Sequence, residues 1–88
     1  MKPLVIIYST MQCPYCDQAK TLLDRKNVAY TEVKIDQDLA ERDKMIRLSG
    51  RRSVPQIFIN NHHVGGYDDL YALERAGALD RLLNQEKE

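Results

Sequence analysis

An uninterrupted apolar run lies near the start of this chain, at residues 4–8 (LVIIY), and Pro14 follows a few residues later. Such a run has the length of a strand that is buried on both faces, as in a parallel sheet. Pro14 predicts the start of a helix with Cys13 as its N-cap, because proline is favoured at the first helical position. This helix is predicted to reach about Lys26. Its buried stripe consists of Cys16, Ala19, Leu22 and Leu23.

The next segments repeat the order of strand and helix. Residues 29–35 alternate between two faces, which predicts a half-exposed strand. Either Asp36 or Asp38 is suited to cap a second helix that runs to Leu48. The inward side of that helix is predicted to carry Leu39, Met45 and Ile46. Because strands that alternate with helices pair in parallel, the first two strands are expected to be parallel neighbours.

The last third of the chain predicts a hairpin and two helices. Residues 56–59 and 62–64 flank the turn-forming pair at 60–61, which is typical of a short antiparallel hairpin. Asp68 and Asp69 are predicted to open a third helix that ends at Gly77. Residues 78–83 are predicted to form a closing helix with its leucines inward, and residues 84–88 are expected to fray. The order β-α-β-α-β-β-α predicts an α/β fold, a four-stranded mixed sheet flanked by helices. Since 88 residues cannot supply two cores, residues 1–88 are expected to form a single domain.

Composition excludes two classes of function. Thirteen Lys and Arg balance thirteen Asp and Glu, whereas nucleic-acid binding needs a surplus of positive charge on one face. The longest apolar run is far shorter than the roughly 20 residues that span a bilayer, and too short for the core of a signal peptide. We therefore expect the protein to bind neither nucleic acid nor a membrane. We expect it to lie in the cytoplasm.

The two cysteines, Cys13 and Cys16, have C-x-x-C spacing, which in a reducing compartment indicates redox or metal chemistry. Cys13 stands at the predicted helix start, where the helix dipole and the backbone N–H groups of Tyr15 and Cys16 favour its thiolate. Cys16 lies one turn further, on the buried stripe. Cys13 is therefore predicted to be the exposed nucleophile, and Cys16 the shielded thiol that attacks a mixed disulfide formed on Cys13.

Three separated segments together carry a family resemblance: C-P-Y-C at 13–16, S-V-P-Q-I-F-I-N at 53–60 and G-G-Y-D-D-L at 65–70. In this order, the chain resembles the glutaredoxins, most closely the short dithiol kind of bacteria. The resemblance implies a thioredoxin-like fold and a glutathione-dependent oxidoreductase that reduces protein–glutathione mixed disulfides and protein disulfides. It implies glutathione as reductant and co-substrate, and no metal. The protein partners that it implies are glutathionylated proteins and reductases such as ribonucleotide reductase. It also implies that the protein is a monomer.

The resemblance also assigns binding residues. The Val54–Pro55 bond is expected to be cis, with Ser53 and Val54 offering backbone groups that pair with glutathione like an added strand. Gly65 and Gly66 let the backbone approach closely, and the N-terminus of the next helix, at Tyr67 and Asp68, is expected to bind the γ-glutamyl carboxylate. Asp68 is implied to bind the γ-glutamyl ammonium, and Tyr15 to line the groove that holds glutathione. Arg52 is implied to lie beside the site, and Arg42 to pair with the glycyl carboxylate.

Each assignment has a structural alternative. Asp68 and Asp69 are also what any helix start favours, the glycine pair at 65–66 suits a plain turn, Arg51 and Arg52 suit a solvated loop, and Tyr15 could simply pack on its helix. The chain also departs from the family at two positions: Thr10 stands where many members have Lys, and Ser53 where Thr is more frequent.

Two other functions compete with the glutathione-dependent enzyme. A carrier of metal or an iron–sulfur cluster would use Cys13 with glutathione, but Pro14 is unusual in cluster-bridging members. Adjacent His62 and His63 lack the spacing of a chelating pair. A thioredoxin-like electron donor would be indifferent to glutathione, but the chain has no tryptophan and its residues 65–69 match a glutathione clamp. A visible absorbance band after anaerobic purification would indicate a cluster.

Overall fold

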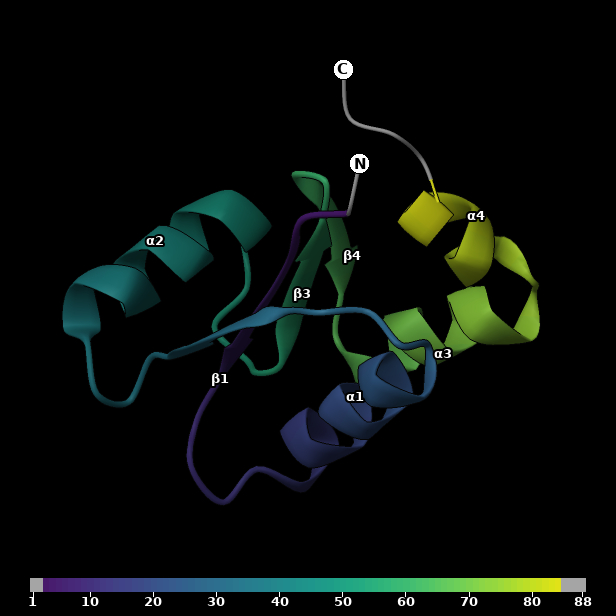
Figure 1. Ribbon diagram of the computed structural model, residues 1–88. Helices are drawn as coiled ribbons and strands as arrows, with labels where there is room; N and C mark the ends of the chain where they lie inside the picture. Colours follow the sequence, from purple (N-terminus) through teal and green to yellow (C-terminus); the bar gives the residue numbers. More distant parts are fainter. Residues whose placement is uncertain (1–2, 85–88) are drawn as a thin grey trace.

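The structure of the protein is a computed structural model, and the residues that it describes are 3–84. Four strands form one mixed sheet in the order β2-β1-β3-β4 (Figure 1). Their bounds are β1 Val5–Ser9, β2 Thr31–Lys34, β3 Gln56–Ile59 and β4 His62–Gly65. β1 pairs in parallel with β2, whereas β1 with β3 and β3 with β4 are antiparallel. The predicted mixed sheet, its parallel first pair and its closing hairpin are confirmed.

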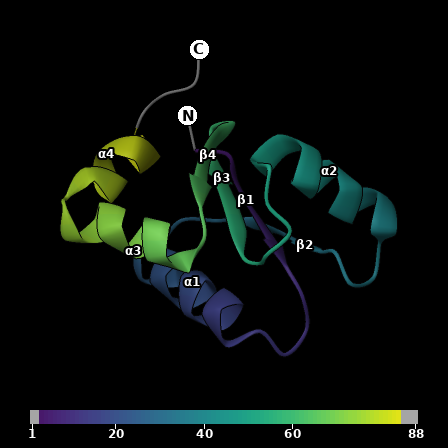
Figure 2. The ribbon, with the colours of Figure 1, turned by 180° about the vertical axis from the view of Figure 1, so that it is seen from behind.

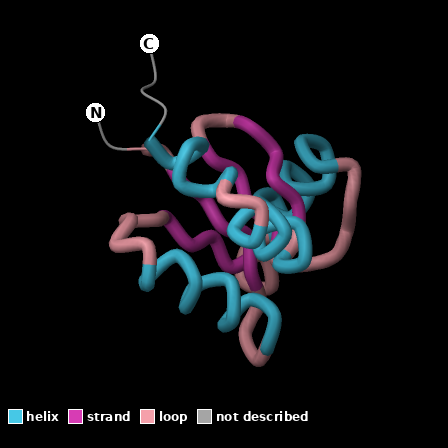
Figure 3. Tube along the Cα trace, turned by 90° about the vertical axis from the view of Figure 1, so that its right-hand side faces the viewer, coloured by secondary structure: helices cyan, strands magenta, loops and turns pink. Residues whose placement is uncertain are grey.

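The helices are α1 Pro14–Arg25, α2 Leu39–Ser49, α3 Tyr67–Arg75 and α4 Ala78–Asn84. They lie on both sides of the sheet, α2 on one side and α1 with α3 on the other (Figure 2). Seen from the side, helices therefore flank the strands (Figure 3). No helix within residues 3–84 is long and apolar enough to cross a bilayer.

Each side of the sheet has its own core. The smaller core, under α2, contains Tyr8, Ile35, Met45 and Phe58. The larger core, on the opposite side, contains Val5, Ile7, Ala19, Leu22, Leu23, Ile57, Ile59, Leu70, Leu79 and Leu83. The two cores share β1 and β3 because successive side chains of a strand point to opposite faces. This is why the apolar run at the start of the chain is continuous rather than alternating.

Lys26, at the end of α1, fixes the last two helices to the first. Its ammonium lies 2.7 Å from a carboxylate oxygen of Glu74 in α3 and 3.0 Å from one of Asp80 in α4. The ion pairs therefore link the C-terminal end of α1 to both α3 and α4.

One core residue was predicted wrongly, and several boundaries moved. Leu39 is 73% exposed rather than inward, because it is the first residue of α2 and none of the residues in that first turn is buried; Met45 carries the contact instead. Helix α3 begins at Tyr67 with Gly66 as N-cap, one residue before the predicted acidic start. Asp38, not Asp36, caps α2. Of the tail predicted to fray, Asn84 ends α4, and residues 85–88 lie outside the described residues.

Candidate active site

The two cysteines occupy unequal positions at the start of α1. Cys13 is the N-cap, with extended backbone dihedral angles, and the N–H of Cys16 donates a hydrogen bond of 3.2 Å to the Cys13 sulfur. Cys13 is half-buried, whereas Cys16 is fully buried on the predicted stripe with Ala19, Leu22 and Leu23. The N-capping position explains the geometry, because the first N–H groups of a helix lack partners within the helix and point at the capping atom.

Cys16 is held as a protonated thiol. Burial foremost, and then the hydrogen bond to the Cys13 side chain, raise the pKa of Cys16 to about 12 against the opposing effects of the Thr10 backbone and the Lys20 ammonium. A thiol with a pKa this high is almost entirely protonated at neutral pH. The Cys16 side chain therefore acts as a donor toward Cys13, and the exposed sulfur of the pair is that of Cys13.

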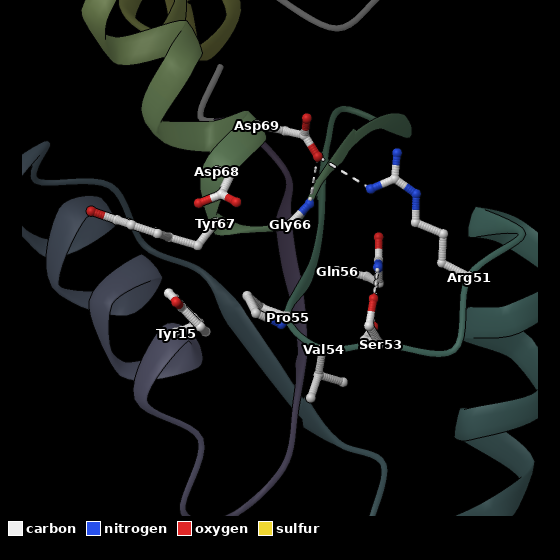
Figure 4. Close-up of a pocket in the computed structure, with 10 residues that line it drawn as sticks. All are labelled: Tyr15, Arg51, Ser53, Val54, Pro55, Gln56, Gly66, Tyr67, Asp68 and Asp69. Carbon is white, nitrogen blue, oxygen red and sulfur yellow. Dashed lines mark hydrogen bonds and ion pairs between the residues drawn. The ribbon is translucent and has the colours of Figure 1, made fainter.

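A pocket of about 270 Å³ opens beside Tyr15 of the C-x-x-C motif, and neither cysteine is among its lining residues (Figure 4). Three segments form its walls: the first turn of α1, the loop that precedes β3, and the first turn of α3. The lining residues are Tyr15, Arg51, Ser53, Val54, Pro55, Gln56, Gly66, Tyr67, Asp68 and Asp69. Segments far apart in sequence thus meet where the C-x-x-C motif lies, as the resemblance implies.

The aromatic side of the pocket consists of stacked tyrosines. The rings of Tyr15 and Tyr67 have their centroids 6.3 Å apart and are inclined by 28°, and Tyr71 continues the row at 5.9 Å from Tyr67. Tyr15 is 58% exposed, so its ring presents a face to solvent rather than to the core. The alternative that Tyr15 merely packs on its own helix does not describe this arrangement, because its partner lies on α3.

The two aspartates in the first turn of α3 have different contacts. The carboxylate of Asp69 accepts the backbone N–H of Gly66 at 3.0 Å and pairs with the Arg51 guanidinium at 3.2 Å. These contacts, the Gly66 hydrogen bond foremost, lower the pKa of Asp69. Asp68, which also lines the pocket, makes no hydrogen bond or ion pair within residues 3–84. Capping is thus the work of Asp69, and the Asp68 carboxylate is available to a ligand.

Of the glycine pair, Gly65 is the residue that its surroundings require, whereas a Cβ on Gly66 would make only an ordinary contact. Gly65 has φ +120°, and a Cβ placed there would collide with the carboxylate of Asp69. A Cβ on Gly66 would lie 3.5 Å from the carbonyl oxygen of Pro55 across the pocket. Glycine at position 65 therefore serves a close approach as well as a turn, since L residues rarely adopt that backbone conformation.

The structure brings together most of the residues that the resemblance selected. Seven of them line one pocket, and the Val54–Pro55 bond is cis, as expected. Those seven are Tyr15, Ser53, Val54, Pro55, Gly66, Tyr67 and Asp68. Arg42, on α2, and Arg52 are not among the lining residues, whereas Arg51 is.

Sequence reasoning missed three lining residues, Arg51, Gln56 and Asp69. Asp69 left a signal: placed three residues after a Gly66 N-cap, it has the spacing of a reciprocal cap. Nothing local distinguishes Arg51 from its neighbour Arg52. The residues between 3 and 84 include no cluster of three or more His, Cys, Asp or Glu side chains suited to hold a metal ion.

A cysteine pair at a helix start, with a cis proline in the adjoining pocket of this α/β arrangement, defines a thiol–disulfide oxidoreductase of thioredoxin-like fold. A family model for glutaredoxin matches residues 5–64. The chain belongs to the glutaredoxin family.

Individual relatives agree over nearly the whole length. Glutaredoxin 3 of Escherichia coli is 54% identical over 79 residues, which cover 90% of this chain and 95% of that protein. The solution structure of glutaredoxin from Brucella melitensis is 48% identical and covers 99% of this chain and 95% of its own, with a TM-score of 0.85. The crystal structure of a buckwheat glutaredoxin–glutathione complex is 30% identical and covers 92% of this chain and 76% of its own, with a TM-score of 0.85.

Proposed function

We propose that this protein reduces protein–glutathione mixed disulfides, and protein disulfides, with glutathione as the electron source. The observation that carries the proposal is the pocket itself. It joins the C-x-x-C turn to a helix N-terminus and to the backbone on either side of a cis proline, and its size suits a peptide of a few residues. The related buckwheat protein was solved in complex with glutathione.

The first step uses Cys13. Its thiolate attacks the glutathionyl sulfur of a protein mixed disulfide, a new sulfur–sulfur bond forms between Cys13 and glutathione, and the protein leaves as a thiolate that takes a proton from water. The N–H of Cys16 and the helix dipole stabilise the Cys13 thiolate before the attack and again when Cys13 is released.

Two routes clear the adduct. A second glutathione thiolate attacks the bound glutathione sulfur, which forms oxidised glutathione and frees Cys13. Alternatively Cys16 loses its proton and attacks the Cys13 sulfur, which expels glutathione and leaves an internal disulfide that two glutathiones reduce. The high pKa of Cys16 favours the first route with small mixed disulfides, because few Cys16 thiols are ionised at any moment.

In the proposed complex, each group of glutathione contacts a different part of the pocket. The backbone of Ser53 and Val54 pairs with the tripeptide, while Tyr15 and Tyr67 cover its flank. The γ-glutamyl carboxylate lies at the first N–H groups of α3, where the helix carries about half a positive charge. The γ-glutamyl ammonium pairs with Asp68, whose carboxylate has no partner within residues 3–84.

For the glycyl carboxylate we favour Arg51, which lines the pocket. Arg42 and Arg52 lie outside the lining set and are proposed to act at longer range, by attracting an anionic substrate, an effect that salt weakens. We further propose that the protein works as a monomer in the cytoplasm, and that disulfide-containing reductases such as ribonucleotide reductase are among its substrates.

A coupled assay tests this function. A glutathionylated peptide is offered with either glutathione plus glutathione reductase, or a thioredoxin reductase, as the sole source of electrons. We expect turnover with glutathione only. Turnover with the thioredoxin reductase alone would instead assign the protein to the glutathione-independent donors, and turnover with neither would reject both.

A further inference from the structure

A buried glutamine joins the floor of the pocket to the neighbouring strand. Gln56, the first residue of β3, is completely buried, and its side-chain amide nitrogen donates to the backbone carbonyl of Ser53 at 3.0 Å and to the Ser53 hydroxyl at 3.3 Å. Figure 4 shows this link between Gln56 and Ser53. On its other side, the Gln56 amide oxygen lies 2.7 Å from the Nε2 atom of His63 on β4.

The chemistry of these groups fixes the direction of the hydrogen bonds. A backbone carbonyl only accepts, so the amide group of Gln56 must turn its nitrogen toward Ser53 and its oxygen toward His63. The Nε2 atom of His63 must then carry a hydrogen. Since Nε2 is protonated in one neutral tautomer and in the imidazolium ion, His63 serves as donor in either charge state.

The His63 ring is itself held in place. It packs against Phe58, its cross-strand partner, with ring centroids 4.9 Å apart. Burial lowers the pKa of His63, as do the positive charges of Arg51 and, to a lesser extent, His62, while Asp69 opposes them. The ring is thus fixed by packing on one side and by a hydrogen bond to a fully buried amide on the other.

We propose that His63 is a positioning residue for the glutathione groove. His63 does not line the pocket, but through Gln56 it fixes the carbonyl of Ser53, and with it the backbone of Val54 that follows. The proposal rests on the proposed function, in which that backbone pairs with the tripeptide.

Removal of the donor has a specific consequence. The Gln56 oxygen would be buried without a partner, which is costly, so the amide would turn or admit water and its hold on Ser53 would loosen. The chemistry at Cys13 belongs to another segment and is unaffected. Contacts made equally in the ground state and the transition state alter KM rather than kcat. We therefore expect an effect on KM alone.

Three variants test this. His63→Phe keeps an aromatic ring against Phe58 but lacks the donor, His63→Gln restores an N–H at similar reach, and His62→Phe is the matched control at the exposed neighbouring position. We expect His63→Phe to raise the apparent KM for a glutathionylated peptide about fivefold at unchanged kcat. His63→Gln should recover most of the loss, and His62→Phe should match wild type.

A double-mutant cycle keeps the test decisive if His63→Phe is less stable. Gln56→Met replaces the amide by an apolar side chain of similar size, so His63→Phe should add no further rise in KM in that background if His63 acts through Gln56. Additive effects would overturn the proposal, as would a His63→Phe enzyme that matches His62→Phe. If wild-type protein shows no glutathione-dependent turnover, the proposed function fails first and the inference falls with it.

Discussion

The carboxylate of Asp69 and the backbone N–H of Gly66 are hydrogen-bonded at 3.0 Å across the first turn of α3. This bond gives the helix its cap from within, and leaves the adjacent Asp68 beside the pocket with no partner in the described part of the chain. Two neighbouring residues of the same type therefore have different surroundings, and mutation can separate the roles proposed for them.

Asp68→Asn should weaken substrate binding without loss of stability. If Asp68 pairs with the γ-glutamyl ammonium, the neutral side chain of the Asp68→Asn variant should raise the apparent KM for a glutathionylated peptide about three- to tenfold. This rise corresponds to roughly 0.7 to 1.4 kcal/mol. Asp69→Ala removes the cap and should lower the free energy of unfolding by about 0.5 to 2 kcal/mol. Steady-state kinetics and urea denaturation of both variants measure this, and the reverse pattern would mean that Asp68 is the structural residue.

The contribution of Asp69 to stability should depend on pH. Its pKa is lowered in the folded state from an ordinary value of 3.8, so its stabilising effect is fully present above that value and is lost as pH falls through the lower, folded-state pKa. The difference in unfolding free energy between wild type and Asp69→Asn should therefore shrink below about pH 4. Because the ion pair with Arg51 is about half exposed, the loss should be only about 0.2 to 1 kcal/mol, and smaller in high salt. Parallel pH profiles would contradict the lowered pKa.

The two cysteines should fail differently. Cys13→Ser should abolish all thiol transfer, because no other exposed thiol remains in the chain. Cys16→Ser should still reduce a glutathionylated peptide and should lose activity on protein disulfides that need a second thiol. Product release from the two substrate types, followed side by side, tests this. Equal loss on the glutathionylated peptide would show that both thiols are needed in the first step.

Gly65→Ala should destabilise the protein more than Gly77→Ala, which is the matched control. Both glycines have positive φ, but a Cβ at Gly77 meets no atom within 4 Å, whereas at Gly65 it meets the Asp69 carboxylate. The control should cost about 1 to 2 kcal/mol from backbone conformation alone. Gly65→Ala should cost more, about 2 to 4 kcal/mol, because the cap is displaced as well. Chemical denaturation measures both, and equal losses would show that Asp69 moves aside freely.

The framework of the fold was predictable because its signals are local. The buried first strand follows from an unbroken apolar run, and the start of α1 follows from Pro14, whose position also made Cys13 the N-cap. The inward stripe of α1 repeats at helical spacing over about two turns, so a small error in the ends of the helix does not change it. These features need no knowledge of the rest of the chain.

The wrong predictions concern residues whose position depends on the exact first residue of a helix or on the path of a loop. Placing the start of α3 at Asp68 instead of Tyr67 concealed the capping role of Asp69. The choice between Arg51 and Arg52 depends on how the loop before β3 turns, which no local pattern records. Leu39 fits the inward side by periodicity but lies in the first turn of α2, where no residue is buried, and helical periodicity alone does not show at which turn the packing begins.

The row of stacked tyrosines makes the protein its own optical reporter. The chain contains five tyrosines and no tryptophan, so its near-ultraviolet emission comes from phenol rings alone. Two of those rings, Tyr15 and Tyr67, line the pocket, and Tyr71 stacks directly behind them. A tripeptide bound against this row would change the emission of most of the chain's tyrosines, so occupancy of the pocket could be followed without an added label.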